Sequence, residues 1–173
     1  MNNKYFSGVG SRATPKEIEP LIKKYSKILV DLGYILRSGG AMGFDSMIEN
    51  SYDLYGGQKE SYLPFPGYNG NQSYLSGVSN GALKLAEKYH PAWHRLSKTG
   101  KELMGRNSFI CLGLKLIHPS DFILCWTPDG KEKGGTGQSM RIAKAFSIPI
   151  FNLAVEKDIN SFDNYLEMVK VFE

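Results

Sequence analysis

Three glycine-rich segments, each between a strand-like run and a helix-like run, constrain what this chain can fold into. They cover residues 8–12, 38–45 and 134–139. Glycine lets a backbone approach a ligand closely, and the N-terminus of a helix offers free N–H groups and the positive end of its dipole. One such segment is weak evidence, but three of them in a chain of 173 residues predict a site for a phosphate-bearing ligand.

Strand-like and helix-like runs alternate along the chain. Apolar residues recur at helical spacing between 18 and 32, whereas 121–126 form the continuous apolar run of a strand buried on both faces. We expect strands at 4–7, 34–36, 60–63, 121–126 and 148–153, and helices at 18–32, 43–55, 80–89, 97–116, 138–146 and 159–169. This alternation implies right-handed crossovers and a mostly parallel sheet. Ligands bind beyond the carboxyl ends of such strands, where the three glycine-rich segments should converge.

Length and composition set the class of protein. The 173 residues allow one domain, residues 1–173, with a sizeable core. No run approaches the roughly 18 apolar residues of a membrane span, so no membrane partner is expected. The start of the chain runs straight into a strand-like segment, which argues against a signal peptide. Cys111 and Cys125 lie in apolar runs without metal-ligand spacing, so we expect reduced thiols, a cytoplasmic protein, and no metal or cofactor.

The formal net charge of +4 is concentrated in one stretch. Between 84 and 106 there are six basic and two acidic residues, together with Tyr89, Trp93 and His94. A solvated helical face is one explanation of this stretch. The other is a surface for an anionic ligand, and aromatic side chains among cations would also suit single-stranded DNA.

Three motifs resemble those of the SLOG superfamily, the Rossmann-like domains named after the DNA-processing protein A and Lonely-guy families. Residues 37–45, Arg-Ser-Gly-Gly-Ala-Met-Gly-Phe-Asp, resemble the Ser-Gly-Gly-Ala-x-Gly-Ile-Asp element of the DNA-processing proteins. Arg106-Asn107 is similar to their Arg-Asn pair, and residues 134–138 are similar to the Gly-Gly-x-Gly-Thr segment of Lonely-guy enzymes. The resemblance implies an α/β, Rossmann-like three-layer sandwich with helices on both faces of the sheet.

Two departures from the Lonely-guy pattern bear on activity. Arg141 stands where the catalytic glutamate of those enzymes would fall, and Lys133 replaces the proline before the two glycines. Cleavage of an N-glycosidic bond develops an oxocarbenium ion, which a carboxylate stabilises and an arginine opposes. We therefore assign no catalytic residue. The alternative is a nucleoside-monophosphate phosphoribohydrolase with a displaced acid, Asp45 or Glu49.

The expected site follows from these motifs. Phosphate should lie on the segments 39–43 and 134–138, with Arg12, Arg106 and Asn107 neutralising or orienting it. A base or second ribose should face Trp126 and an ordered excursion at 64–78. Asp45 either complements the dipole of its helix or accepts a hydrogen bond from a ribose hydroxyl. The full set is Gly10, Ser11, Arg12, Ser38, Gly39, Gly40, Ala41, Gly43, Asp45, Arg106, Asn107, Trp126, Gly134, Gly135, Thr136, Gly137 and Gln138.

These observations favour a protein that binds a small nucleotide-derived molecule. SLOG domains of bacterial immune systems recognise ADP-ribose-derived signals, so the resemblance implies that ligand class or another nucleotide signal. Without the hydrolase glutamate, the chain would act as a sensor or a sequestering protein, including a phage protein directed against immunity. The partners expected are the small ligand and further copies of the chain in a homo-oligomer, with nucleic acid as the less favoured alternative.

Overall fold

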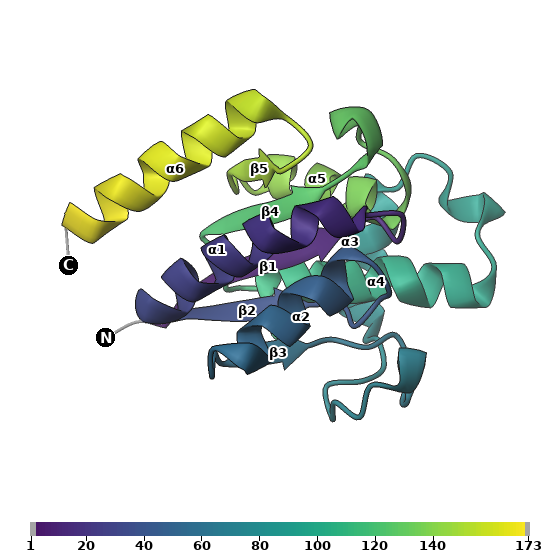
Figure 1. Ribbon diagram of the computed structural model, residues 1–173. Coiled ribbons are helices and arrows are strands. Elements are labelled where there is room, and N and C mark those ends of the chain that lie inside the picture. The colour runs from purple at the N-terminus through teal and green to yellow at the C-terminus, as the bar shows by residue number, and fades with distance from the viewer. Residues whose placement is uncertain (1–2, 172–173) are drawn as a thin grey trace.

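The computed structural model describes residues 3–171, which form a five-stranded sheet in which all neighbouring strands are parallel (Figure 1). The strands are β1 (Lys4–Gly10), β2 (Tyr34–Ser38), β3 (Lys59–Ser61), β4 (Phe122–Trp126) and β5 (Ile150–Asn152). Their order across the sheet is β3-β2-β1-β4-β5. The chain therefore builds outward from β1 to one edge and then crosses to the other side of β1, which places a topological switch point between β1 and β4.

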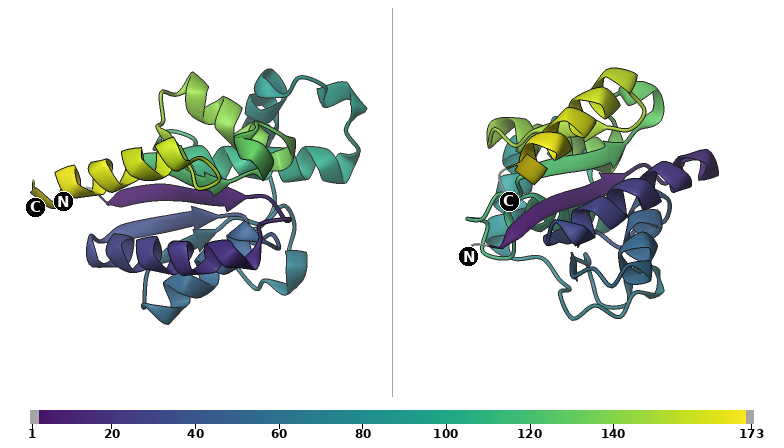
Figure 2. Two further views of the ribbon diagram at one scale, coloured as in Figure 1. Left: turned by 45° about the horizontal axis from the view of Figure 1, so that its top comes forward. Right: turned by 60° about the vertical axis from the view of Figure 1, so that its left-hand side comes forward.

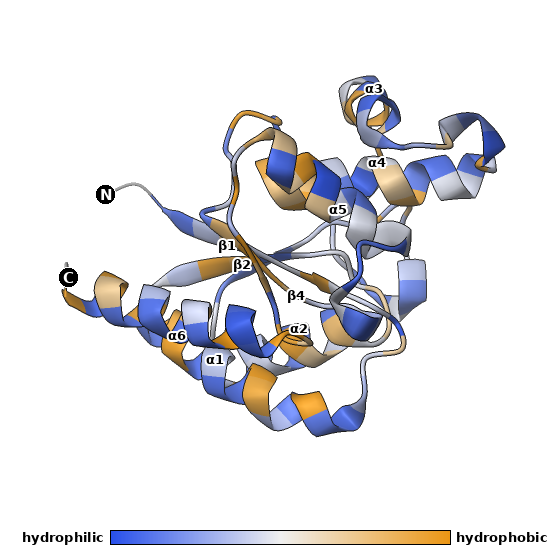
Figure 3. Cartoon of the chain, turned by 90° about the horizontal axis from the view of Figure 1, so that it is seen from above, coloured by the Kyte–Doolittle hydropathy of each residue, from blue (hydrophilic) through white to orange (hydrophobic). Residues whose placement is uncertain are grey.

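Helices cover both faces of the sheet, so the expected three-layer α/β architecture is confirmed. The described residues contain α1 (Glu19–Asp31), α2 (Phe44–Leu54), α3 (Asn80–Tyr89), α4 (Lys98–Leu112), α5 (Gly134–Ala145) and α6 (Glu156–Val171). Figure 3 shows α1, α2 and α6 on one side of the strands and α3, α4 and α5 on the other. Among residues 3–171, no helix is long and apolar enough to cross a membrane.

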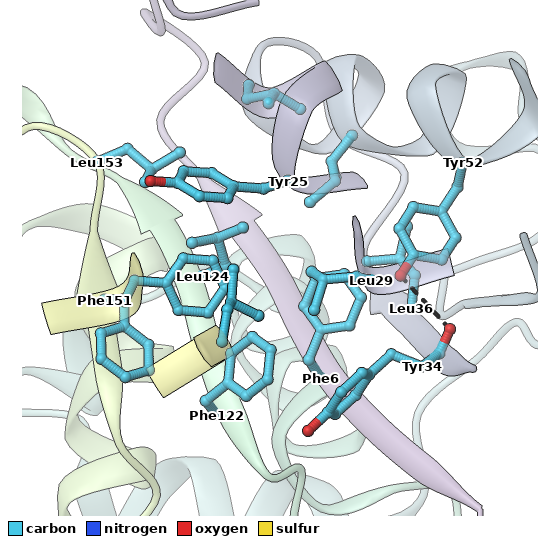
Figure 4. Packing of buried hydrophobic residues seen from close by; sticks show 14 of the residues in the cluster. Phe6, Tyr25, Leu29, Tyr34, Leu36, Tyr52, Phe122, Leu124, Phe151 and Leu153 are labelled. Atoms are coloured by element: carbon cyan, nitrogen blue, oxygen red, sulfur yellow. Dashed lines mark hydrogen bonds between the residues drawn. The ribbon is translucent and has the colours of Figure 1, made fainter. Parts of the chain in front are cut away.

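Strand β4 explains why the sheet is sandwiched. Its side chains alternate, so that Phe122 and Leu124 enter the core beneath α1 and α6 while Ile123 and Cys125 enter the core beneath α4 and α5. On the first face, Phe122 lies among other aromatic rings, with its centroid 5.3 Å from that of Phe6 and 5.9 Å from that of Phe151 (Figure 4). Burial of these rings fixes the centre of the sheet and, through it, the positions of the strand ends.

Several boundaries differ from the expected ones. Helix α4 ends at Leu112 rather than at residue 116, and α6 begins at Glu156 rather than at residue 159. Two further differences lie in glycine-rich segments. Strand β1 continues through Gly10, because residues 8–10 pair with 124–126 of β4. Helix α5 begins at Gly134 rather than Gln138, so the glycines of the third segment form the first turn of the helix. The segment 64–78 is an excursion, as expected, and contains only a short 3-10 turn at Tyr68–Gly70 (Figure 2).

Candidate functional site

A pocket of about 390 Å³ lies at the carboxyl ends of β1 and β4, where the order of the strands reverses. All three glycine-rich segments contribute to its wall, so their predicted convergence on one rim is confirmed. The pocket is lined by Val9, Gly10, Ser11, Arg12, Ala41, Asp45, Tyr68, Leu103, Met104, Arg106, Asn107, Thr127, Pro128, Lys133, Gly134, Gly135, Thr136 and Ser139.

In the first two segments, glycine is needed because protein atoms leave no room for a side chain. A Cβ on Gly10 would overlap the side chain of Phe44, and one on Gly39 would overlap the Arg106 guanidinium. Gly43 has a φ of +80°, and its Cβ would lie 2.5 Å from the carbonyl oxygen of Ser11. These glycines let the two segments pack against each other. They form a floor under the pocket, and their conformation does not depend on a ligand.

The third segment differs, because its first two glycines are open toward the pocket. A Cβ on Gly134 would meet no atom within 4 Å, and one on Gly135 would meet only Asn107 and Met104, both at 3.7 Å. The N–H of Gly137 closes the first turn by donating to the carbonyl of Lys133 at 2.9 Å. The N–H groups of 134–136 precede that bond, and no group within residues 3–171 accepts from them. This end of α5 can therefore receive an anion.

Asp45 joins the first two segments. Its carboxylate is 4% exposed and accepts hydrogen bonds from the backbone N–H groups of Gly10 and Gly39, each at 3.1 Å, and of Ala41 at 3.5 Å. Burial raises the pKa of Asp45 to about 6, although the positive charge of Arg106 and the backbone bonds oppose that shift. The carboxylate oxygens are therefore engaged with the protein's own backbone.

Arg106 and Asn107 link the second segment to the third. The Arg106 side chain is buried and donates to the carbonyl of Gly39, to that of Tyr62 at 3.2 Å, and to the Asn107 side-chain oxygen at 3.0 Å. Asn107 in turn donates to the carbonyl of Gly135 at 2.9 Å. The pair therefore fixes the start of α5 relative to the floor of the pocket, and it leaves a buried positive charge beside it.

Two further cations lie at the rim. The side chains of Arg12 and Lys133 are exposed and line the pocket. Together with Arg106 and the N-terminal end of α5, they outweigh the single carboxylate of Asp45 in the pocket wall. The site is therefore electrostatically suited to an anion.

Comparisons with protein-family models and with curated proteins found no match to this sequence. Comparison with solved structures found DNA processing protein A from Helicobacter pylori, whose single-stranded DNA binding mode that structure describes. It is 19% identical, with a TM-score of 0.57, over 86% of this chain and 64% of that one. The molybdenum cofactor carrier protein from Chlamydomonas reinhardtii is 16% identical, with a TM-score of 0.60, over 96% and 86% of the two chains.

DNA processing protein A from Streptococcus pneumoniae is 16% identical, with a TM-score of 0.54, over 94% of this chain and 56% of that one. This chain therefore spans only about two thirds or less of the DNA processing proteins that it matches. Identities this low show the fold alone. The chain shares the Rossmann-like fold of these structures. The resemblance seen in the sequence motifs is thereby confirmed at the level of fold.

Within this fold, the two acids considered for catalysis and Arg141 make contacts with the rest of the protein. Glu49 accepts hydrogen bonds from the N–H of Gly40 at 3.1 Å and from the Asn71 amide at 3.2 Å, and it does not line the pocket. Arg141 also lies outside the pocket wall, and it donates to the Tyr89 carbonyl and to the Gln138 side chain, each at 2.8 Å. Arg141 thus ties α5 to the end of α3.

Seven of the expected site residues do not reach the pocket. Gln138 is fully buried and donates to the Ala86 carbonyl at 2.9 Å, so it also faces α3. Trp126 packs against the core on the α1 and α6 side of the sheet. The others lie behind the pocket wall: Ser38, Gly39, Gly40, Gly43 and Gly137.

Several pocket residues were absent from the expected set. Thr127 and Pro128 directly follow β4, so the rule that ligands bind beyond strand ends would have found them. Leu103 and Met104 give α4 an apolar wall one turn before Arg106, and their residue types carry no functional signal. Tyr68 comes from the excursion at 64–78, whose path the sequence does not predict. No group of three or more metal-ligating side chains occurs in the described part of the chain.

The perturbed pKa of Asp45 makes a prediction about stability. The pKa of Asp45 has its ordinary value of 3.8 in the unfolded chain and is about 6 in the folded one. The folded state therefore binds more protons than the unfolded state between these two pH values. The contribution of Asp45 to the free energy of unfolding is therefore fully present below about pH 4 and lost as pH rises through about 6. The Asp45→Asn variant lacks this titratable group. As pH rises from about 4 to 6, the free energy of unfolding of the wild type should therefore fall relative to that of the variant, which urea unfolding would measure.

The control for this experiment is Asp53→Asn on the same helix. Asp53 is largely exposed and pairs with Lys59, so its substitution should remove one exposed ion pair and change the free energy of unfolding by less than about 1 kcal/mol. Asp45→Asn should also lower stability by about 1–3 kcal/mol at neutral pH, because an amide nitrogen cannot accept from the backbone N–H groups. A constant difference between wild type and Asp45→Asn from pH 4 to 7 would contradict the shifted titration.

Proposed function

We propose that the pocket binds a phosphate-bearing, nucleotide-derived small molecule, with its phosphate on the N-terminal turn of α5. The observation that carries this proposal is the open backbone of Gly134 and Gly135, whose N–H groups have no partner within residues 3–171 and border the pocket. Phosphate suits such a helix start because it accepts several N–H bonds and complements the dipole.

The remaining wall supports the same ligand class. Arg12 and Lys133 supply exposed charge at the rim, and Arg106 supplies buried charge at the base. A volume of about 390 Å³ lies within the range of small-molecule sites. By the resemblance to SLOG domains, an ADP-ribose derivative or another nucleotide signal is the proposed ligand, and the protein is a cytoplasmic sensor or sequestering protein. A homo-oligomer and a phage role against immunity remain expectations from the sequence.

We also propose that the ligand is bound without being turned over. Asp45 is the carboxylate of the pocket wall, and its oxygens already accept from three backbone N–H groups. Glu49 and Arg141 lie outside that wall. A hydrolase needs an acid free to approach the reacting bond, and neither Asp45 nor Glu49 meets that requirement.

Gly135→Val should abolish the stabilisation by ligand without unfolding the protein. The φ of Gly135 is not positive and its Cβ would make only ordinary contacts, so the fold tolerates the side chain while the branch covers the N–H groups that would hold phosphate. Thermal melts with a panel of nucleotides, ADP-ribose included, should show a rise in Tm for wild type and none for the variant. A ligand at one hundred times its Kd stabilises by about 2.7 kcal/mol.

The matched control is Gly81→Val. Gly81 occupies the corresponding second position of α3, where a Cβ would come no closer than 3.6 Å to another residue. This variant should keep the full ligand response. The proposal would fail if the panel left the wild-type Tm unchanged, or if Gly135→Val responded as strongly as Gly81→Val.

The absence of turnover is tested separately. After long incubation with the protein, a bound nucleotide should be recovered intact and at stoichiometric occupancy by mass spectrometry, because no free acid faces the pocket. Release of free base or ribose phosphate, lost in Asp45→Asn or Glu49→Gln, would instead favour the phosphoribohydrolase alternative.

A second candidate function is binding of single-stranded DNA, which the likeness to DNA processing protein A supports. Trp93 and the cations Lys84, Lys98 and Lys101 surround a second pocket of about 480 Å³ between α3 and α4. The Lys101 ammonium lies 5.6 Å from the centre of the Trp93 ring. An aromatic ring among lysines can stack a base and contact its phosphates, but Glu87 and Glu102 in the same wall oppose a polyanion.

Oligonucleotide binding would separate this candidate from the first. If Trp93 and its lysines bind DNA, the logarithm of the affinity should fall linearly with that of the salt concentration, and Trp93→Ala should weaken binding several-fold. Fluorescence anisotropy with a labelled oligothymidylate would measure both effects. Gly135→Val should then have no influence, which would place any such binding outside the pocket at α5.

A further inference from the structure

Tyr68 belongs to none of the three glycine-rich segments and still reaches the pocket. It lies on the excursion at 64–78, between β3 and α3, and it is the residue of that excursion that lines the pocket. The centre of its ring is 5.5 Å from the guanidinium carbon of Arg106. Among the described residues that line this pocket, Tyr68 is the one aromatic side chain. The ring therefore borders the same space as the phosphate-binding turn of α5.

The backbone around Tyr68 has an unusual conformation that presents this ring. Gly67 and Gly70 have φ values of +74° and +71°, and Asn69 between them has a φ of +52°. The left-handed region disfavours side chains other than those of asparagine and aspartate. Glycine and asparagine at these three positions therefore favour this turn. It turns the chain sharply on both sides of Tyr68.

Two contacts hold that turn to the second glycine-rich segment and to Glu49 of α2, and a third contact lies within the excursion. The side-chain amide of Asn69 donates to the carbonyl of Gly40 at 3.0 Å, and that of Asn71 donates to Glu49 at 3.2 Å. The ring of Phe65 meets the ring of Tyr68 edge to face, with centroids 5.5 Å apart and planes at 89°. Tyr68 is thus positioned before any ligand arrives, and its ordering adds little to the cost of binding.

We propose that Tyr68 is the residue against which a planar, unsaturated ring of the ligand packs. The inference rests on the proposed function, because it assumes a phosphate on α5. The rest of the wall beyond the phosphate is apolar without an aromatic ring, as at Val9, Leu103 and Met104, or polar. An aromatic face fixed in position favours another ring over a sugar or an acyl chain. The ligand is therefore a molecule with both a phosphate and a ring, such as a nucleotide, rather than a simple sugar phosphate.

The test compares ligands with and without a ring on the same phosphate. Calorimetric titrations would use the four common nucleoside 5′-monophosphates and ribose 5-phosphate. Against wild type, at least one monophosphate should bind more tightly than ribose 5-phosphate. Tyr68→Leu should weaken that nucleotide about tenfold while changing the affinity for ribose 5-phosphate less than twofold, and Tyr68→Phe should retain most of the affinity.

Tyr74→Leu is the matched control. Tyr74 lies on the same excursion, is 91% exposed and does not line the pocket, so its substitution should leave both affinities unchanged. If Tyr68→Leu weakens both ligand types equally, or if no monophosphate binds more tightly than ribose 5-phosphate, the role of Tyr68 is overturned while the phosphate site stands. If neither ligand type binds wild type, the proposed function fails and this inference fails with it.

Discussion

The buried carboxylate of Asp45 is the interaction on which the pocket depends. Parallel strands end in loops that have no ladder partners, and the ends of β1 and β2 must be held together without covering the rim. Asp45 does this by accepting from the backbone N–H groups of both ends, at Gly10, Gly39 and Ala41. The low dielectric that makes a buried charge costly also strengthens each of these bonds. The rigid floor that results supports Arg106, Asn107 and the excursion at 64–78.

One sequence signal, glycine after a strand, corresponds here to two physical roles. In the first two segments the missing Cβ lets backbone and buried side chains of the protein approach one another, as at Gly10 and Gly39. In the third segment the missing Cβ leaves the N-terminal turn of α5 open. Sequence alone does not separate these roles, because the atom that a Cβ would meet comes from elsewhere in the fold. In the third segment, the free backbone that the ligand hypothesis requires borders the pocket.

The fold could be predicted from the sequence, but only part of the site could. Continuous apolar runs such as 121–126 and helical spacing such as 18–32 reflect burial that every residue of an element shares, so the errors were confined to the ends of elements, as at Gly10, Leu112 and Gly134. Whether a residue lines the pocket depends on the direction of its own side chain. Trp126 and Thr127 are neighbours at the end of β4, yet strand alternation and the turn that follows send Trp126 to the core and leave Thr127 in the pocket wall.

Arg141 occupies a position where the resemblance implies a catalytic residue, but its side chain holds helix α5 in place. The resemblance places a glutamate of the Lonely-guy enzymes here, whereas this arginine donates to the Tyr89 carbonyl and to Gln138, and its guanidinium lies 3.7 Å from Glu132. These contacts orient α5, whose first turn offers its N–H groups to the pocket. A glutamate at 141 would lose both donated bonds and bring a second negative charge toward Glu132. Restoring the acid alone would therefore disturb the anion site rather than create a hydrolase.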